Sequence, residues 1–232
     1  MQKSILFLFA LALVGACHKD PTVAPVDSGN NIQLSKMAVG QKSYYLRLAG
    51  EGFRDEAPYS FSYLPDTLVA EIIAENAGVF TIKEYLTPGS ASIVTPDKID
   101  GIPGGSGEYV YKLKVDKGQL QLVELVSGQW QPRLFGKTTV VLPLADIQTN
   151  EIKISGWMPG GNVTVDQGFV LSFQLSETTF DRLNFVRDYA DMAFDGTGFF
   201  YLYSEQAGIV RAGYVSSWGL PGMAWDLLEK AE

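Results

Sequence analysis

Apolar and polar side chains alternate along much of the chain with a period of two residues, the period of a β-strand with one buried face. In YVYKLKV, residues 109–115, the odd positions are apolar or aromatic, whereas Lys112 and Lys114 fall between them. The DKG sequence that follows is typical of a tight turn, and QLQLVELV, residues 119–126, returns as a second apolar segment. This pattern predicts a β-hairpin.

The same arrangement recurs twice more. TLVAEIIAEN runs to Gly78 and VFTIKEYL follows it, which predicts a second hairpin. GFFYLYSEQAGIVRAGYV, residues 198–215, predicts strand, turn at Glu205 to Gly208, and strand. This last segment is similar to the closing hairpins of some envelope proteins built on one strongly curved antiparallel sheet, and the similarity implies architecture alone.

Three other segments complete the expected elements. FVLSFQL, residues 169–175, alternates as one strand, and residues 178–194 fit either a helix or a strand, of which we favour a strand because strands flank it. PGMAWDLLEK, residues 221–230, predicts a short terminal helix. Phe199 and Phe200 are adjacent and therefore point to opposite faces of their strand. If both are buried, both faces of that strand are covered.

Many short strands separated by Gly, Pro, Asn and Asp turns predict an all-β protein. We expect an antiparallel meander of hairpins that forms a strongly curved sheet, either a barrel or a half-barrel. A β-sandwich is the second choice. At most one or two short helices are expected.

The beginning of the chain differs from the rest. Lys3 precedes an apolar run, ILFLFALALV at residues 5–14, which as a helix would be about 15 Å long, half the thickness of a hydrocarbon core. This length and order fit a secretory signal peptide. The following VGAC, residues 14–17, resembles the lipobox of bacterial lipoproteins, in which the cysteine receives a diacylglycerol and becomes the first residue of the mature protein.

The resemblance implies cleavage between Ala16 and Cys17, and lipidation of Cys17. The expected organisation is a signal peptide at residues 1–16, a lipidated flexible tether at 17–31, and a single β-rich domain at 32–232. Residue two of the mature chain is His18 rather than aspartate. In the resembled family this favours the outer membrane, without deciding between its periplasmic and surface faces. A single fatty chain holds a protein only reversibly, but the two or three of a lipoprotein give a stable anchor.

Charge and cysteine content narrow the function. Removing residues 1–16 takes away one basic residue, Lys3, and leaves 17 Lys and Arg against 26 Asp and Glu, a net charge of −9. Nucleic-acid binding requires clustered basic residues, so we expect no nucleic-acid partner. Cys17 is the sole cysteine, so its acylation would leave no thiol for a disulfide.

Candidate catalytic groups are few. His18 is the sole histidine and falls in the predicted tether, which disfavours Ser–His–Asp catalysis, Cys–His catalysis and zinc sites. GIPGGSG at 101–107 lacks the ending of a phosphate-binding loop. Asp188, Asp191 and Asp195 are candidate calcium ligands without EF-hand spacing. No cofactor is expected, and no carboxylate pair is selected for glycoside hydrolysis.

Three functions remain open from the sequence. The first is a lipid-anchored, non-enzymatic binding or interaction module of the cell envelope. The second is a carrier of a hydrophobic ligand, which requires an apolar cavity of several hundred Å³. The third is a carboxylate-dependent glycan hydrolase, which requires two acidic side chains about 5–10 Å apart in a cleft. The partners expected are therefore the membrane, through the anchor, and a hydrophobic or glycan ligand.

The lipidation of Cys17 is directly testable. We expect the full-length protein to incorporate labelled palmitate in bacteria and the Cys17→Ser variant to lose that label, because the thiol is the acceptor atom. The measurement is gel fluorography of the two immunoprecipitated proteins at equal expression. Undiminished labelling of Cys17→Ser would contradict the assignment.

Overall fold

The computed structural model describes residues 31–50, 60–87, 108–127, 134–135, 140–156, 158–159, 165–189, 198–215 and 222–228. These residues form strands and turns and contain no helix. The strands are β1 (Lys42–Gly50), β2 (Phe61–Asn76), β3 (Val79–Leu86), β4 (Tyr109–Asp116), β5 (Gln119–Ser127), β6 (Val141–Pro143), β7 (Ile154–Ser155), β8 (Met158–Pro159), β9 (Gln167–Val170), β10 (Phe173–Leu175), β11 (Thr178–Phe180), β12 (Leu183–Tyr189), β13 (Gly198–Ser204), β14 (Gly208–Val215) and β15 (Gly222–Leu227).

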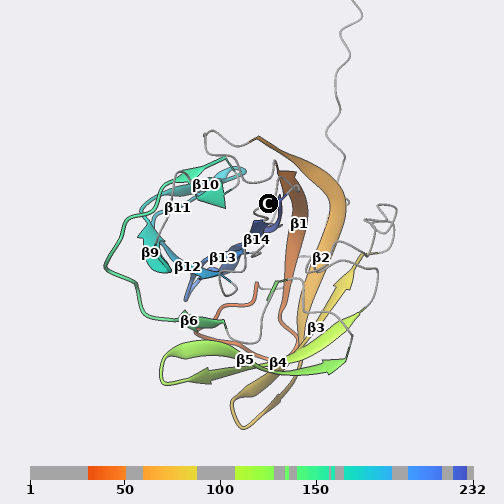
Figure 1. Cartoon of the computed structure of the whole chain (residues 1–232). Coiled ribbons are helices and arrows are strands. Elements are labelled where there is room, and N and C mark those ends of the chain that lie inside the picture. Colours follow the sequence, from red (N-terminus) through yellow and green to blue (C-terminus); the bar gives the residue numbers. More distant parts are fainter. Residues whose placement is uncertain are drawn as a thin grey trace, which may run out of the picture.

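Eleven of these strands form one antiparallel sheet that curls into a half-barrel (Figure 1). Its order is β6-β5-β4-β3-β2-β1-β15-β14-β13-β12-β9, and the pairs β10–β11 and β7–β8 form two small separate sheets. The predicted all-β, strongly curved antiparallel sheet is thus confirmed, in its half-barrel form. The three predicted hairpins correspond to β4–β5, β2–β3 and β13–β14.

Side chains link the two ends of the curled sheet. The amide nitrogen of Asn184 on β12 donates to the carbonyls of Pro143 and Ala145, and its Oδ1 accepts from the Ile147 amide at 2.9 Å. The Tyr203 hydroxyl donates to the Pro143 carbonyl at 2.8 Å. Because β6 is one edge strand and β12 lies beside the other edge strand, β9, these bonds hold the half-barrel curled where strand pairing does not close it.

The core lies on both faces of β13. Phe199 is 5% exposed and Phe200 is 1% exposed, although they point to opposite faces, so both faces are covered. On one face the rings of Tyr201, Phe135 and Tyr111 follow one another at centroid distances of 5.8 and 5.7 Å. On the other, Phe200 stacks on Phe185.

The predicted terminal helix is wrong. Gly222–Leu227 forms β15, which pairs with β1 on one side and β14 on the other and is buried at all six positions. An apolar run without clear period fits either a buried helix or a strand buried on both faces. Here the segment is a strand because β1 and β14 pair with it on both sides.

Two further segments differ in detail or were ambiguous. The predicted single strand at 169–175 is broken at Leu171, which is 55% exposed, into β9 and β10. The preference for strands within 178–194 is confirmed for β11 and β12, and residues 190–194 lie outside the described part of the chain.

The sheet has two dissimilar ends. At one, which we call the turn end, β2–β3, β4–β5 and β13–β14 are joined by two or three residues each, at 77–78, 117–118 and 205–207. At the other, the far end, Gly50 lies opposite both Phe61 and Gly222, and Gly198 lies opposite Val215. The connections that start there are longer, with ten residues between β1 and β2, eight between β12 and β13, and six between β14 and β15.

The first described residues lie against the turn end. The Ile32 amide donates to Ser43 Oγ near the start of β1 at 2.8 Å, and the Ser35 amide donates to the Glu205 carbonyl at 3.2 Å. Ile32 and Leu34 are both buried in the core. The segment that follows the predicted tether is therefore part of the folded domain and enters it at the turn end.

Gly208 allows this entry. Its φ is +77°, and a Cβ at this position would overlap the backbone carbonyl of Ile32. Gly78 has the same φ of +77° but no atom within 4 Å of an added Cβ. The two glycines therefore have the same backbone strain on substitution, and Gly208 alone of the two has the steric overlap.

We expect Gly208→Ala to lower the free energy of unfolding by at least ~1 kcal/mol more than Gly78→Ala does. Both variants incur the left-handed penalty of an L-residue, and Gly208→Ala must also displace Ile32 from the core. Urea denaturation of the two variants measures the difference. Equal losses in the two variants would indicate that the segment around Ile32 shifts away from residue 208 without lowering the free energy of unfolding.

Candidate functional site

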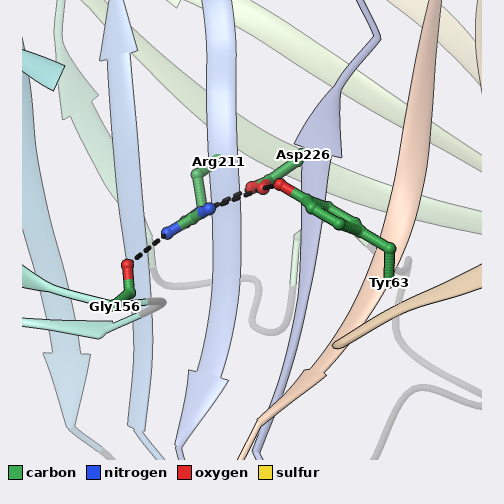
Figure 2. Close-up of polar contacts among 4 residues, drawn as sticks. All are labelled: Tyr63, Gly156, Arg211 and Asp226. Atoms are coloured by element: carbon green, nitrogen blue, oxygen red, sulfur yellow. Dashed lines mark hydrogen bonds and ion pairs between the residues drawn. The ribbon is translucent and has the colours of Figure 1, made fainter. Parts of the chain in front are cut away.

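A buried ion pair joins the last two strands of the chain. The Arg211 guanidinium on β14 donates from Nε and Nη2 to the two carboxylate oxygens of Asp226 on β15 (Figure 2). Arg211 is 2% exposed and Asp226 is 1% exposed. This paired, planar geometry is the strongest form of carboxylate recognition by arginine.

Neighbouring groups complete the environment of this pair. The Tyr63 hydroxyl on β2 donates to Asp226 Oδ2 at 2.7 Å, and Arg211 Nη1 donates to the Gly156 carbonyl at 3.4 Å (Figure 2). The centre of the Phe173 ring lies 4.9 Å from the guanidinium carbon of Arg211. Tyr63, Asp226, Arg211 and Gly156 thus form one continuous hydrogen-bonded chain across the sheet.

Strand register brings these residues together. Arg211 is the cross-strand partner of Asp226, so both side chains point to the same face. Tyr63 is the partner of Leu48, whose partner on β15 is Ala224, two residues from Asp226. Because side chains two apart share a face, Tyr63 points to the face that carries Asp226.

A second buried ion pair lies on the opposite face of the same strands. Arg47 on β1 is the partner of Trp225, the neighbour of Asp226, and its Nη1 donates to Asp66 Oδ2 on β2 at 2.9 Å. Arg47 Nε donates to the Met223 sulfur at 3.0 Å. Asp66 is 1% exposed.

A β-bulge positions Asp66. The register of β1 with β2 passes from Leu46↔Thr67 to Leu48↔Tyr63, so residues 64–66 lie opposite the single residue Arg47. Pro65 falls within this stretch and has no amide hydrogen to pair with β1, which is why the ladder is interrupted here. Bulges commonly redirect a side chain, and this one places Asp66 beside Arg47.

The two ion pairs are satisfied to different degrees. Both Asp226 oxygens accept hydrogen bonds, whereas Asp66 Oδ1 is buried without a hydrogen-bond partner in the described structure. An unsatisfied buried acceptor destabilises a fold. The Arg211–Asp226 pair is therefore the better structural anchor of the two.

Tyr63 connects the buried ion pair to the surface. Tyr63 is 40% exposed, while its hydroxyl turns inward to Asp226. Burial of the hydroxyl, together with the adjacent Asp226 carboxylate, raises the pKa of Tyr63 well above its ordinary value. The phenol therefore stays protonated, and remains a donor to Asp226, throughout the physiological range.

An aromatic pair stands at the far end of the sheet. The rings of Phe61 and Tyr63 meet edge to face at a centroid distance of 5.5 Å and an angle of 88°. Each residue is 40% exposed. Edge-to-face contact is a favoured arrangement of two aromatic rings, so the pair holds a fixed shape at the surface.

Of the site residues predicted from the sequence, one lies in the described part of the chain and three lie outside it. Cys17, Asp191 and Asp195 lie outside the described residues. Asp188 is on β12, where its register partner on β13 is Phe199. Within the described ranges no group of three or more His, Cys, Asp or Glu side chains is placed to hold a metal ion. The described part also contains no helix of a length and apolarity that would cross a membrane.

The buried carboxylates in the described structure are all engaged. Asp66 and Asp226 pair with arginines, and Glu84, which is 0% exposed, accepts from the Tyr111 hydroxyl at 2.7 Å. Burial and the Glu84 carboxylate raise the pKa of Tyr111 well above its ordinary value. Glycoside hydrolysis needs two carboxyl groups that a substrate can reach. These three are buried, and each is bonded to an arginine or a tyrosine.

An apolar pocket lies inside the half-barrel, lined by residues that include Tyr45, Ile82, Leu120 and Phe135. The volume of this cavity is about 20 Å³. That is room for about one water, against roughly 300 Å³ or more for a typical ligand site. This pocket does not accommodate an acyl chain.

Sequence reasoning missed Arg47, Tyr63, Asp66, Arg211 and Asp226 as a group. One signal was present, because Arg211 and Asp226 are single charges inside otherwise apolar runs, GIVRAGYV and GMAWDL. A lone charge in a strand buried on both faces needs a partner. The partner itself was not readable, since the strand order that supplies it is non-local.

Comparison with known proteins gave no match, whether with protein-family models, with curated proteins or with solved structures.

We expect Asp226→Ala to lower the free energy of unfolding by about 3–5 kcal/mol, because it leaves Arg211 buried without its counter-charge. Tyr63→Phe should cost about 1 kcal/mol, since it removes one hydrogen bond and leaves Asp226 paired. Chemical denaturation measures both values.

The exposed Lys112–Glu124 pair, at 2.7 Å, provides the matched control. Glu124→Ala should change stability by less than about 1 kcal/mol, as is usual for exposed ion pairs. A loss for Asp226→Ala no larger than that for Glu124→Ala would show that the buried pair does not stabilise the joint between β14 and β15.

Proposed function

We propose that this protein is a lipid-anchored, non-enzymatic binding module of the cell envelope, held at the outer membrane through Cys17. Its recognition surface is the far end of the half-barrel, at Phe61 and Tyr63. The observation that carries the proposal is the exposed aromatic pair whose Tyr63 is fixed from below by the Asp226–Arg211 ion pair.

Preorganisation supports a binding role for this pair. Immobilising a side chain on binding costs about 0.5–1.5 kcal/mol, and a ring already fixed avoids much of that cost. Tyr63 is held by its neighbour Phe61 and by the hydrogen bond to Asp226. Exposed, rigid aromatic side chains with an apolar face and a polar tip are the usual anchors of binding surfaces.

The position of the pair supports the same role. Binding residues are commonly carried near the connections at one end of a rigid β-scaffold. The far end carries the long connections, and the segment that follows the predicted tether enters at the opposite end. A domain tethered at the turn end presents Phe61 and Tyr63 away from its anchor.

The chemistry of the surface limits its ligand. Two aromatic rings offer apolar contact area and no positive charge, which suits a glycan or an apolar surface better than an anion. The acidic net charge agrees with this, since it disfavours anionic ligands by long-range repulsion.

The proposal is tested by native mass spectrometry of the mature domain carrying Cys17→Ser, purified gently from the periplasm. We expect a non-covalently bound species that is reduced at least tenfold in Phe61→Ser. The exposed ring can be removed without opening the core, so folding should be unaffected.

Leu171→Ser is the matched control, because Leu171 is also an exposed apolar residue, at 55%, but lies on the turn side of β9. It should retain the bound species. A species lost in Leu171→Ser and retained in Phe61→Ser would contradict the placement of the recognition surface, and a lipid that survives both changes would favour the carrier instead.

A further inference from the structure

Exposed apolar side chains also occur at the turn end. Val39 is 58% exposed and Ile73 is 41% exposed. Turn tips in soluble proteins are usually polar or glycine, because they project into water. A β-branched apolar residue at such a tip calls for an explanation.

Local hydrogen bonds fix Val39 at the tip. The Gln41 amide donates to the Ala38 carbonyl at 3.2 Å, which makes residues 38–41 a β-turn with Val39 at its first central position. Gly40, the second central residue, has a φ of +90°, the left-handed value that this turn requires. The Gly40 amide donates to the Ile72 carbonyl at 2.8 Å, so the turn lies directly beside Ile73 on β2.

The predicted tether joins the domain at this same end. Ile32 and Ser35 are bonded to Ser43 and Glu205, both at the turn end. Residues 17–31 separate this point from the proposed anchor, and a flexible chain of that length has an average span of about 20 Å. Resting on the proposed lipidation of Cys17, this keeps the turn end, of the two ends, close to the bilayer.

Tethering changes how much contact is needed. A short flexible linker confines its domain at an effective concentration of about millimolar, so a surface with millimolar affinity is already docked about half of the time. A small apolar tip reaches that range where a free protein would show no binding. The exposed charges at this end include Lys36, Lys117, Glu75 and Asp116, which are of both signs, so apolar contact rather than charge decides the occupant.

We infer that the turn end docks on the lipid bilayer, with Val39 and Ile73 inserted among the headgroups. The half-barrel then stands upright on the membrane, and Phe61 and Tyr63 face outward from it. Docking of this kind depends on apolar contact and therefore persists on neutral lipid and in moderate salt.

The test uses the single thiol of the mature chain, residues 17–232. Cys17 is coupled to a maleimide phospholipid in phosphatidylcholine vesicles, or to soluble maleimide-poly(ethylene glycol) as the reference. Hydroxyl-radical footprinting then measures side-chain oxidation by mass spectrometry. We expect oxidation of Val39 and Ile73 to fall at least twofold on vesicles, with Phe61 and Tyr63 unchanged.

A pair of variants separates insertion from crowding. Val39→Asp should restore the oxidation of Ile73 on vesicles to the reference level. Val123→Asp, which places the same charge at another exposed valine, 46% exposed on β5 beyond the stretch that pairs with β6, should leave Ile73 protected. Circular dichroism of each variant confirms that the sheet is retained.

Two results would overturn the inference. One is equal oxidation of Val39 and Ile73 on vesicles and on the polymer, and the other is equal protection of Phe61 and Tyr63, which would mean that the domain lies flat. Because the coupling is chemical, either result stands even if Cys17 is not acylated in cells. Palmitate labelling answers that separate question.

Discussion

The insertion of β15 between β1 and β14 is the constraint on which the rest of the structure depends. Without it the sheet would be two meanders, β1 to β6 on one side and β9 with β12 to β14 on the other. The backbone ladders of β15 join them, and the Arg211–Asp226 pair lies across one of the two joints. The last described strand in sequence thus lies in the middle of the sheet, so the sheet cannot be completed before residues 222–227 are in place.

The curled shape follows from that joint and from the side-chain hydrogen bonds that link the β12–β13 region to the β6 region, near the two edges of the sheet. Asn184 and Tyr203 hold the carbonyls of the β6 region, so the sheet is constrained both at its centre and at its ends. β5 is paired with β6 only over Gln119–Gln121, so the rest of its length forms an edge of the sheet, and its register with β4 shifts twice in that part. Bulges of this kind distort an edge and discourage pairing with another chain. We therefore place recognition at the far end rather than along this edge.

The parts of the fold that could be predicted are those set by local pattern. The hairpins β2–β3, β4–β5 and β13–β14 each have alternating strands and a turn within one short stretch of sequence. The β15 strand could not be predicted, because GMAWDL has no clear period and becomes a strand only through two partners far away in sequence. Phe199 and Phe200 are an intermediate case, since adjacency fixed their opposite directions but left burial open. The candidate site was the least predictable part, because Tyr63 and Asp226 are 163 residues apart and a bulge at Pro65 sets how β2 meets β1.

The presence of charge at the joint is explained by register more readily than by stability. Replacing a buried ion pair with apolar residues of similar volume is often neutral or stabilising, so such a pair is weak evidence for stability alone. A strand buried on both faces, however, has no apolar alternation to fix its register, and a slip by one residue exchanges its two faces. In β15 such a slip would move Asp226 to the face of Arg47 and leave Arg211 buried alone, at a cost of several kcal/mol. The charged pair therefore selects one register, and that register also places Asp226 beneath Tyr63, which couples correct assembly of the sheet to the shape of the surface at its far end.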